Sequence, residues 1–342
     1  MGITPAGQRL RARLFQETRR FFEGEEYLEV DVPVLADSLI PEPHLEVFET
    51  HYVVPYEDPP QRRPLYLTPS PEVYLKRLLA EGWPSLFCLS RAFRNAESIG
   101  RLHNPEFTML ECYTRGADFG DSVEITERFL AYLLDRLRDE VVAYRQERGR
   151  PGQEALDALQ PPVVSHTVDE LMQRHAGALD GWAETRETMA ATARAVGLEP
   201  APEDSFERIF NHLFVQYVEP ELAGDTAVLV TQYPAGVPTL AKRRENTPWS
   251  DRWELYLHGL EVANCYTEET RPIEVAGFFQ SERVRKQSNF IVHPVDPGYP
   301  SLFDGTEEPI SGVAIGMDRL LMAILGAKDM EEVMAFPSRV VV

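Results

Sequence analysis

Residues 93–111, FRNAESIGRLHNPEFTMLE, gather charged and amide side chains in a short loop-like run that then returns to apolar residues. Arg94 and Arg101 carry planar guanidinium groups that suit phosphate oxygens, and His103 and Asn104 add neutral donors where the apolar sequence resumes. A solvated charged loop would have the same composition. The run therefore predicts either an exposed turn or a site for phosphate and a planar base, and other segments must decide between them.

Three glutamates recur at every seventh residue in the segment 253–269, WELYLHGLEVANCYTEE. They are Glu254, Glu261 and Glu268, and two of them stand among apolar neighbours in strand-like sequence, where an unpaired carboxylate is costly to bury. A cation should therefore face them. Mg²⁺ accepts one or two carboxylates together with substrate phosphates, and an ammonium group would suit the third. The alternative is that all three lie on the solvent side of an amphipathic strand.

Small residues alternate in the segment 311–322, SGVAIGMDRLLM. Gly312, Ala314 and Gly316 would let the backbone approach a ligand closely. The helix that follows carries Arg319 near its start, and this arginine could reach a triphosphate. Tight strand packing explains the small residues equally well.

The composition is that of a soluble globular protein, since 43% of the 342 residues are hydrophobic and 26% are charged. No apolar run approaches the roughly 18 residues of a membrane span. The N-terminal residues also lack the continuous apolar stretch of a secretory signal. We therefore expect a cytoplasmic protein without a membrane partner.

The formal net charge of -21 disfavours nucleic-acid binding, because such binding depends on clustered Lys and Arg. Basic residues do cluster at 9–20 and 242–244, where a solvated helix face or turn would explain them. The cysteines, Cys88, Cys112 and Cys265, form no Cys-X-X-Cys pair, which argues against a zinc site and a disulfide framework. We expect buried or half-buried thiols.

The apolar patterns predict strands in two groups with helices before, between and after them, which favours an α+β domain built on an antiparallel sheet. We expect one domain over 1–342, with 149–205 as a peripheral helical and loop segment. Helical spacing predicts helices that end near Gly24 and that span 71–82, with Ser70 as N-cap, 121–148, 167–197 and 317–326. Strands are predicted over 27–35, 44–54, 85–93, 107–116, 226–234, 253–269 and 310–316.

Taken together, the charged loop, the carboxylate segment and the glycine strand that leads to Arg319 resemble the second and third signature motifs of class II aminoacyl-tRNA synthetases. Residues 66–79, YLTPSPEVYLKRLL, and the run 93–111 are most similar to the lysyl branch. Residues 29–35, EVDVPVL, would correspond to the first motif, which forms the dimer. The similarity extends from the first helix to AFPSR at 335–339.

The first motif begins close to residue 1, so we expect no N-terminal anticodon-binding barrel. The chain is more similar to the elongation factor P lysine ligase family, whose members activate (R)-β-lysine with ATP and transfer it to a lysine of elongation factor P; PEPHLEVFET at 41–50 resembles that family too. This resemblance implies ATP and Mg²⁺, a substrate that is lysine or (R)-β-lysine, a homodimer, and a sheet of six or seven antiparallel strands. A tRNA partner is not expected. The alternatives are an enzyme that charges tRNA through its acceptor stem alone, and an inactive paralogue with a regulatory or binding role.

The resemblance also implies roles for individual residues. Arg94 would hold the α-phosphate of ATP and Arg319 the far phosphates, which makes both catalytic. Glu254 and Glu261 would bind Mg²⁺. Further contacts to ATP would come from Asn95, Glu97, His103, Asn104, Glu254, Leu255 and Gly316. The lysyl substrate would contact Ser70, Pro71, Glu72, Tyr113, Glu261, Asn264, Glu268 and Ala314.

The sequence departs from the family pattern at three positions. Ala96 interrupts the usual Arg-Asn-Glu, which leaves open whether Glu97 takes over the role of that glutamate. Cys265 stands where relatives generally have glycine, and it could alter the floor of the pocket. Ala314 replaces a glycine that is usual in lysyl-tRNA synthetases, and its methyl group would narrow the space near the substrate amine. This favours the ligase branch.

Overall fold

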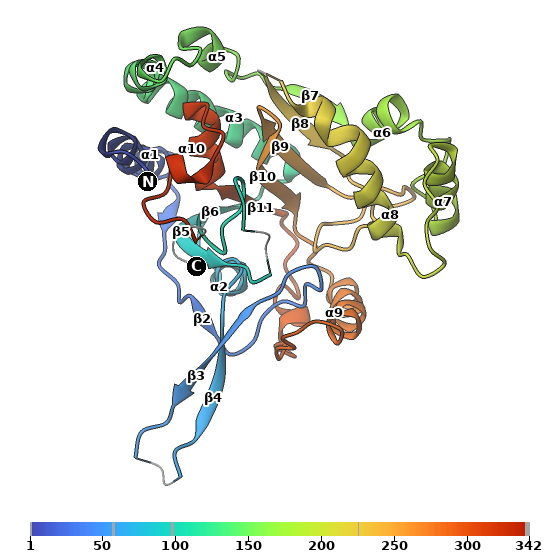
Figure 1. Ribbon diagram of the computed structural model, residues 1–342. Helices are drawn as coiled ribbons and strands as arrows, with labels where there is room; N and C mark the ends of the chain where they lie inside the picture. Colours follow the sequence, from blue (N-terminus) through green and yellow to red (C-terminus); the bar gives the residue numbers. More distant parts are fainter. Residues whose placement is uncertain (1, 57–58, 97–98, 225, 339–342) are drawn as a thin grey trace.

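The central sheet has eight strands within the residues that the computed structural model describes, which are 2–56, 59–96, 99–224 and 226–338. Their spatial order is β1-β5-β6-β11-β10-β9-β8-β7 (Figure 1). The six strands from β5 to β8 in this order pair antiparallel, and β1 and β7 add a parallel strand at each edge. The strands are Leu28–Glu29 (β1), Leu86–Phe93 (β5), Glu106–Arg115 (β6), Val164–Thr167 (β7), Ala227–Thr231 (β8), Arg252–Leu257 (β9), Leu260–Thr267 (β10) and Ile310–Gly316 (β11).

The α+β class with an antiparallel sheet is confirmed, and the six strands that pair antiparallel fall within the expected six or seven, but two further strands extend the sheet to eight in the described part of the chain. Both extra strands are short edge strands, and β7 pairs in parallel with β8, which requires a long crossover that no local pattern signals. The single strand expected over 27–35 is wrong. The segment forms β1 and, with Leu35–Ala36, β2, and between them Pro33 has no backbone N–H to give to a sheet.

A second, three-stranded sheet has the order β2-β4-β3. Its hairpin, β3 (Phe48–Val53) and β4 (Arg62–Leu67), projects away from the body of the molecule (Figure 1). This confirms the predicted strand within 44–54. The loop between β2 and β3 lies against the body of the molecule. Glu46 forms a β-bridge with Asn95 just after β5, and Lys286 of α9 donates to the carbonyl oxygen of Glu42 at 3.0 Å.

Helices lie on both faces of the central sheet. One face carries α1, α3, α4 and α10, where Leu14, Leu133 and Leu321 are fully buried in one apolar cluster that also contains Trp253 of β9. On the opposite face α2 packs against Tyr113 of β6. The helices are α1 (Pro5–Gly24), α2 (Glu72–Ala80), α3 (Phe119–Arg136), α4 (Arg138–Glu147), α5 (Gln153–Asp157), α6 (Val168–Ala176), α7 (Arg186–Ala195), α8 (Phe206–Leu213), α9 (Pro272–Lys286) and α10 (Met317–Leu325).

The predicted helices are confirmed with two differences. The helix expected over 121–148 is two helices, α3 and α4, that meet at Leu137. Helices α5, α8 and α9 were not predicted as individual helices. Within the described ranges, no helix is both long and apolar enough to span a membrane. The three cysteines are buried and form no disulfide with a described residue, as expected.

Residues 164–222 form a layer beside β8. Helices α6, α7 and α8 bury a separate apolar cluster around Trp182, Met189 and Phe210. The cluster packs onto the sheet through Val228 and Val230 of β8. These helices therefore cover the end of the sheet that carries β7 and β8.

The segment 253–269, expected as one strand, is the β9–β10 hairpin. Its turn is His258-Gly259, and both residues have positive φ, 51° and 73°, as a tight two-residue hairpin turn requires. A bulge between Glu261 and Ala263 then inserts one extra residue into β10. Because side chains alternate along a strand, this extra residue places Glu261 on the same face as Asn264, although an odd number of positions separates them.

A buried ion pair joins the two ends of the chain to the sheet. Arg11 of α1 lies 2.5 Å from Asp318 of α10, and both side chains are less than a tenth exposed. Asp318 also accepts from the backbone N–H of Thr108 at 2.7 Å, and Arg11 donates to the carbonyl oxygen of Val333 at 3.1 Å. The explanation of the 9–20 basic cluster as a solvated face is therefore wrong for Arg11.

We predict that Asp318→Asn lowers the free energy of unfolding by about 3 kcal/mol, because it leaves the Arg11 guanidinium buried without its counter-charge. Urea denaturation monitored by circular dichroism measures this loss. Asp304→Asn, at an exposed position, is the control. A loss in Asp318→Asn no larger than in the control would show that the pair does not stabilise the fold.

Candidate active site

Alternating residues of four neighbouring strands divide the core from a polar cleft. On β9 and β10, Trp253 and Cys265 point into the apolar core, whereas Glu254 and Asn264 face the cleft. The same alternation on β11 places Ala314 in the cleft, in register with Asn264. The central strands of the sheet therefore carry the site on one face and the core on the other.

The cleft consists of two joined cavities of about 280 and 390 Å³. The first lies against α2 and contains most of the carboxylates. The second lies against the start of α10 and contains Arg319. Eight residues line both cavities and so mark their junction: Glu42, His44, Leu45, Arg94, Met109, Arg252, Asn264 and Ala314.

A buried lysine bridges two carboxylates at the wall of the first cavity. The Nζ atom of Lys76 lies 2.5 Å from Oε1 of Glu72 and 2.5 Å from Oε2 of Glu268, and its side chain is 2% exposed. Burial alone would lower the pKa of Lys76, but the charges of Glu268 and Glu72 raise it well above its usual value. Tyr266 donates a further hydrogen bond to Glu72 at 2.9 Å. Lys76 is therefore a permanent cation within the site.

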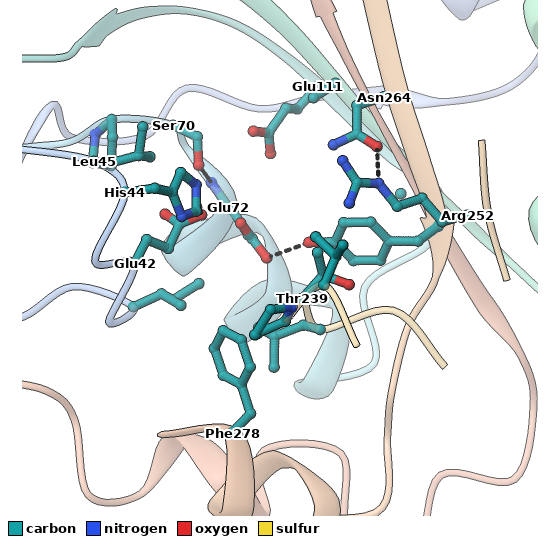
Figure 2. A pocket seen from close by; sticks show the side chains of 18 of the residues that line it. Glu42, His44, Leu45, Ser70, Glu72, Glu111, Thr239, Arg252, Asn264 and Phe278 are labelled. Carbon is teal, nitrogen blue, oxygen red and sulfur yellow. Dashed lines mark hydrogen bonds and ion pairs between the residues drawn. The ribbon is translucent and has the colours of Figure 1, made fainter. Parts of the chain in front are cut away.

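The first cavity still contains more carboxylates than Lys76 can neutralise. Oε1 of Glu268 is buried without a hydrogen-bond partner among the described residues, and burial raises the pKa of this side chain to about 8 although Lys76 opposes the shift. Burial and the charge of Glu72 raise the pKa of Glu111 well above its usual range. Figure 2 shows Glu111 and Glu72 directed into the same cavity. A cationic ligand would relieve this excess of negative charge.

Two arginines stand at the junction of the cavities. Arg94 lies over the ring of Phe107, with its Cζ 5.2 Å from the ring centre, and it forms no ion pair with any described residue. Its buried Nε also lacks a partner among those residues. Arg252 donates to Glu254 at 2.5 Å and to Asn264 at 3.2 Å, as the dashed line in Figure 2 marks for the second contact. Arg94 is thus a cation free to bind an anion.

The second cavity combines cations with carboxylates, among them Glu254 and Glu261. Arg319 donates to the backbone oxygen of Glu261 at 3.0 Å and lies 2.8 Å from Nε2 of His103, which fixes its position beside the cavity. The carboxylate of Glu254 accepts from the hydroxyl groups of Tyr233 and Tyr256 at 2.5 and 2.7 Å.

Glu254 and Glu261 have the donor chemistry of a partial Mg²⁺ site. Burial, and next the charge of Glu254, raise the pKa of Glu261 to about 7. The carboxylate of Glu261, whose charge is disfavoured by burial and by Glu254, would be matched by a divalent cation whose remaining ligands are phosphates and waters. No group of three or more His, Cys, Asp or Glu side chains suited to a metal occurs among the residues described. The pair therefore fits a metal that arrives with a phosphate ligand.

The structure brings most of the predicted site residues together. Those that line the first cavity are Ser70, Glu72, Tyr113 and Glu268; Arg94, Asn264 and Ala314 line both cavities; and His103, Asn104, Glu254, Glu261, Gly316 and Arg319 line the second. Ser70 was expected to be the N-cap of α2, but Pro71 occupies that position; the hydroxyl of Ser70 accepts from the backbone N–H of Glu72 at 3.3 Å.

Four predicted positions lie elsewhere. Leu255 packs in the core, because alternation along β9 turns it away from Glu254. Asn95 hydrogen-bonds the backbone of Val47 and borders neither cavity, and Pro71 caps α2 without lining one. Cys265 does not form the pocket floor; it is buried on the core side, 3.3 Å from the hydroxyl of Ser311.

Glu97, one of the predicted contacts to ATP, lies outside the described residues. The glycine of β11 with the clearest steric role is Gly312, where a Cβ atom would lie 2.5 Å from the ring of Tyr113 and 2.9 Å from Glu268. Gly312 therefore makes room for these two side chains.

Sequence reasoning missed several residues of the site, among them Glu42, His44, Glu111 and Arg252, and also Lys76, which pairs with two glutamates of the cavity wall. Two signals could have revealed some of them. Lys76 follows Glu72 by four positions, which places both on one face of a helix. Glu111 interrupts the apolar run TMLEC within a strand, where an ionisable residue needs an explanation.

We predict that Glu268→Gln stabilises the protein increasingly as pH rises. The pKa of Glu268 is about 8 in the folded protein and 4.5 ordinarily. Between these two pH values the unfolded wild type releases the proton of Glu268 while the folded wild type keeps it, so the free energy of unfolding of the wild type falls as pH rises. The variant cannot ionise, and its advantage in free energy of unfolding should grow from about pH 4.5 to 8 and then level off. Urea titrations at several pH values measure it, with Glu124→Gln on α3 as charge control; a difference that does not change with pH would contradict the prediction.

Comparison with known proteins agrees with this geometry. A family model described as tRNA synthetases class II (D, K and N) matches residues 6–340. The chain is 34% identical over 333 residues to the lysine–tRNA ligase of Pelotomaculum thermopropionicum, covering 96% of this chain and 62% of that protein. It is 32% identical over 328 residues to the elongation factor P–(R)-β-lysine ligase of Haemophilus ducreyi, covering 95% of this chain and 92% of that protein.

A third relative, the elongation factor P–(R)-β-lysine ligase of Yersinia enterocolitica, is 33% identical over 329 residues, or 96% of this chain and 93% of that protein. The chain therefore spans less than two thirds of the tRNA ligase and nearly the whole length of the two protein ligases. By its sequence and by the cleft on its antiparallel sheet, the chain belongs to the class II tRNA synthetase family of the D, K and N enzymes.

Proposed function

We propose that this protein activates (R)-β-lysine, or lysine, with ATP and transfers the aminoacyl group to a lysine side chain of elongation factor P. The observation that carries the proposal is the junction of a cavity rich in unneutralised carboxylates with a cavity that holds arginines. The first suits a ligand with two ammonium groups and the second suits a triphosphate. The names of the similar protein ligases support the choice of acceptor.

Both amines of the substrate would find carboxylates in the first cavity. Glu268 offers a buried oxygen without a partner among the described residues, and Glu111 lies beside Tyr113, whose hydroxyl is 3.3 Å from it. Each of these two carboxyl groups would lose its proton and bind one ammonium group of the substrate instead. A monoamine such as norleucine would leave one of these carboxylates buried without a counter-charge, which disfavours its binding.

The second cavity would hold ATP. Arg94 at the junction would neutralise the α-phosphate, and Arg319 would neutralise the phosphates farther along. Glu254 and Glu261 would hold Mg²⁺, which, when bound, neutralises charge on phosphate oxygens. His103, Asn104 and Gly316 line the remaining wall.

The reaction would then proceed in two steps. The substrate carboxylate attacks the α-phosphorus of ATP, the bond to pyrophosphate breaks, and an aminoacyl-adenylate forms across the junction. Arg94 stabilises charge on the α-phosphate as it develops, and the carboxylates of the first cavity orient the substrate. In the second step the amine of an acceptor lysine attacks the carbonyl carbon, and AMP leaves.

We further propose that residues 1–342 form one domain, with 149–205 at its periphery, and that two copies form a dimer. Contact of the α6–α8 layer with β8 supports the first point. Exposed apolar side chains along the first motif, Leu28 and Leu35, and on the projecting hairpin, Tyr52 and Val53, support the second.

Two assays distinguish this proposal from its alternatives. Pyrophosphate exchange with lysine and with (R)-β-lysine tests adenylate formation, and transfer of the labelled amino acid to elongation factor P or to tRNA identifies the acceptor. Labelled elongation factor P supports the proposal. Labelled tRNA would instead indicate a tRNA-charging enzyme, and absence of exchange with either amino acid would indicate an inactive paralogue.

We predict that Arg94→Ala lowers pyrophosphate exchange by about 100-fold or more, because it removes the cation at the α-phosphate. The thermal unfolding midpoint should stay near that of the wild type, since Arg94 makes no ion pair with a described residue. The control is Arg91→Ala, at an exposed position of β5. Full exchange in Arg94→Ala would refute the role of Arg94.

Arg319→Ala should also abolish exchange, with a loss of stability, because Arg319 holds the backbone of Glu261.

We predict that Ala314→Gly raises activity with α-lysine selectively. Ala314 lines both cavities and pairs with Glu111 on β6, which supports the proposal that its methyl group would lie near the amine whose position differs between the two lysine isomers. A methyl group in a tight pocket discriminates by roughly 10- to 200-fold. Stability should fall by about 0.5–1 kcal/mol from backbone entropy, with Ala92→Gly on β5 as the control. Values of kcat/KM for both isomers measure selectivity; an unchanged ratio would show that the methyl group does not select.

A further inference from the structure

The transfer step needs a base that the proposed roles do not supply. An acceptor lysine is an ammonium ion at neutral pH and must lose a proton before its nitrogen can attack. The carbonyl carbon of the adenylate would lie at the junction of the two cavities. Among the eight residues at this junction, only Glu42 and His44 can accept a proton near neutral pH, since the two arginines stay charged and the other four do not titrate.

Glu42 is placed to meet an incoming side chain. Its carboxylate accepts no hydrogen bond from a described residue, and its side chain is 27% exposed toward the cleft, whereas those of Glu111 and Glu268 are buried. Its closest basic neighbour is His44, whose Nε2 lies 3.9 Å away (Figure 2). Lys286 donates to the backbone oxygen of Glu42, which anchors the loop and leaves the carboxylate free.

The charges around Glu42 allow it to exchange protons at neutral pH. Burial, followed by the charge of Glu72 on α2, raises the pKa of Glu42 to about 7. Burial and the charges of the two arginines lower the pKa of His44 to about 4, so His44 stays neutral and does not compete for the proton. The cations that oppose the rise at Glu42 come from three elements: Arg94 after β5, Lys286 on α9 and Lys76 on α2.

We propose that Glu42 is the general base of the transfer step, an inference that rests on the proposed function. Its carboxylate takes one proton from the acceptor ammonium, and the freed nitrogen lone pair forms a C–N bond to the carbonyl carbon. The C–O bond to the phosphate breaks, and AMP leaves with that electron pair. The second proton, released as the amide forms, passes to the departing phosphate or to water, so charge and atoms balance.

The test separates the two half-reactions in Glu42→Gln. Pyrophosphate exchange serves as the reference, and single-turnover transfer from preformed adenylate to elongation factor P is followed from pH 6 to 9. We expect transfer to fall about 100-fold or more relative to exchange. The wild-type transfer rate should decrease below an inflection near pH 7, and the variant should lack this inflection. Hydroxylamine is already neutral at pH 7 and needs no base. The variant should therefore lose much less of its rate of adenylate cleavage by hydroxylamine than of its rate of transfer to the acceptor lysine.

The matched control is Glu49→Gln, which removes the same charge from the neighbouring strand β3, outside both cavities. Unchanged transfer and pH dependence in Glu42→Gln would overturn the assignment. So would an equal loss in exchange, transfer and hydroxylamine reaction, which would indicate a structural role, or an effect confined to His44→Gln. Absence of exchange in the wild type would overturn the proposed function itself and this inference with it.

Discussion

Lys76 holds Glu72 of α2 and Glu268 of β10 together at distances of 2.5 Å in a place that water does not reach. One cation there compensates two carboxylates, and the neighbouring Glu111 has no cation of its own. Neutralising all of them with protein side chains would stabilise the fold but would leave no demand for a ligand. Burial, and after it the charge of Glu72, raises the pKa values of Glu111 and Glu268, and the carboxylates that Lys76 does not compensate explain why the cleft suits a diammonium substrate.

The pleat of the sheet makes this cleft compatible with a stable core. Each central strand gives one set of side chains to the apolar cluster under α1, α3 and α10 and the other set to the cleft. The position of Glu261 depends on strand register, because the bulge after this residue places its side chain on the cleft face of β10. Without that extra residue, Glu261 would point into the core, and the second cavity would lose one of the two carboxylates proposed to hold Mg²⁺.

The sequence predicted the α+β class, most central strands and the residues that carry charge in recognisable motifs. It predicted Glu254, Glu261 and Glu268 from their spacing, although that spacing reflects a turn and a bulge and not one strand. Leu255 and Asn95 were assigned to ATP from motif position alone, and the pleat and a backbone contact at Val47 place them elsewhere. Glu42 and His44 could not be predicted, because a loop residue gains its role only when folding returns it to a distant sheet.

The central claim is that buried carboxylates of the cleft hold protons before the substrate binds and exchange them for the ammonium groups of the substrate. Isothermal titration calorimetry of lysine or (R)-β-lysine binding at pH 7, repeated in buffers of different ionisation enthalpy, measures this exchange directly. The account predicts that the wild type releases protons when the substrate binds. Glu268→Gln should release fewer protons, because its amide side chain has no carboxyl proton to lose. Binding heats that are the same in every buffer would show that no proton leaves, and would contradict it.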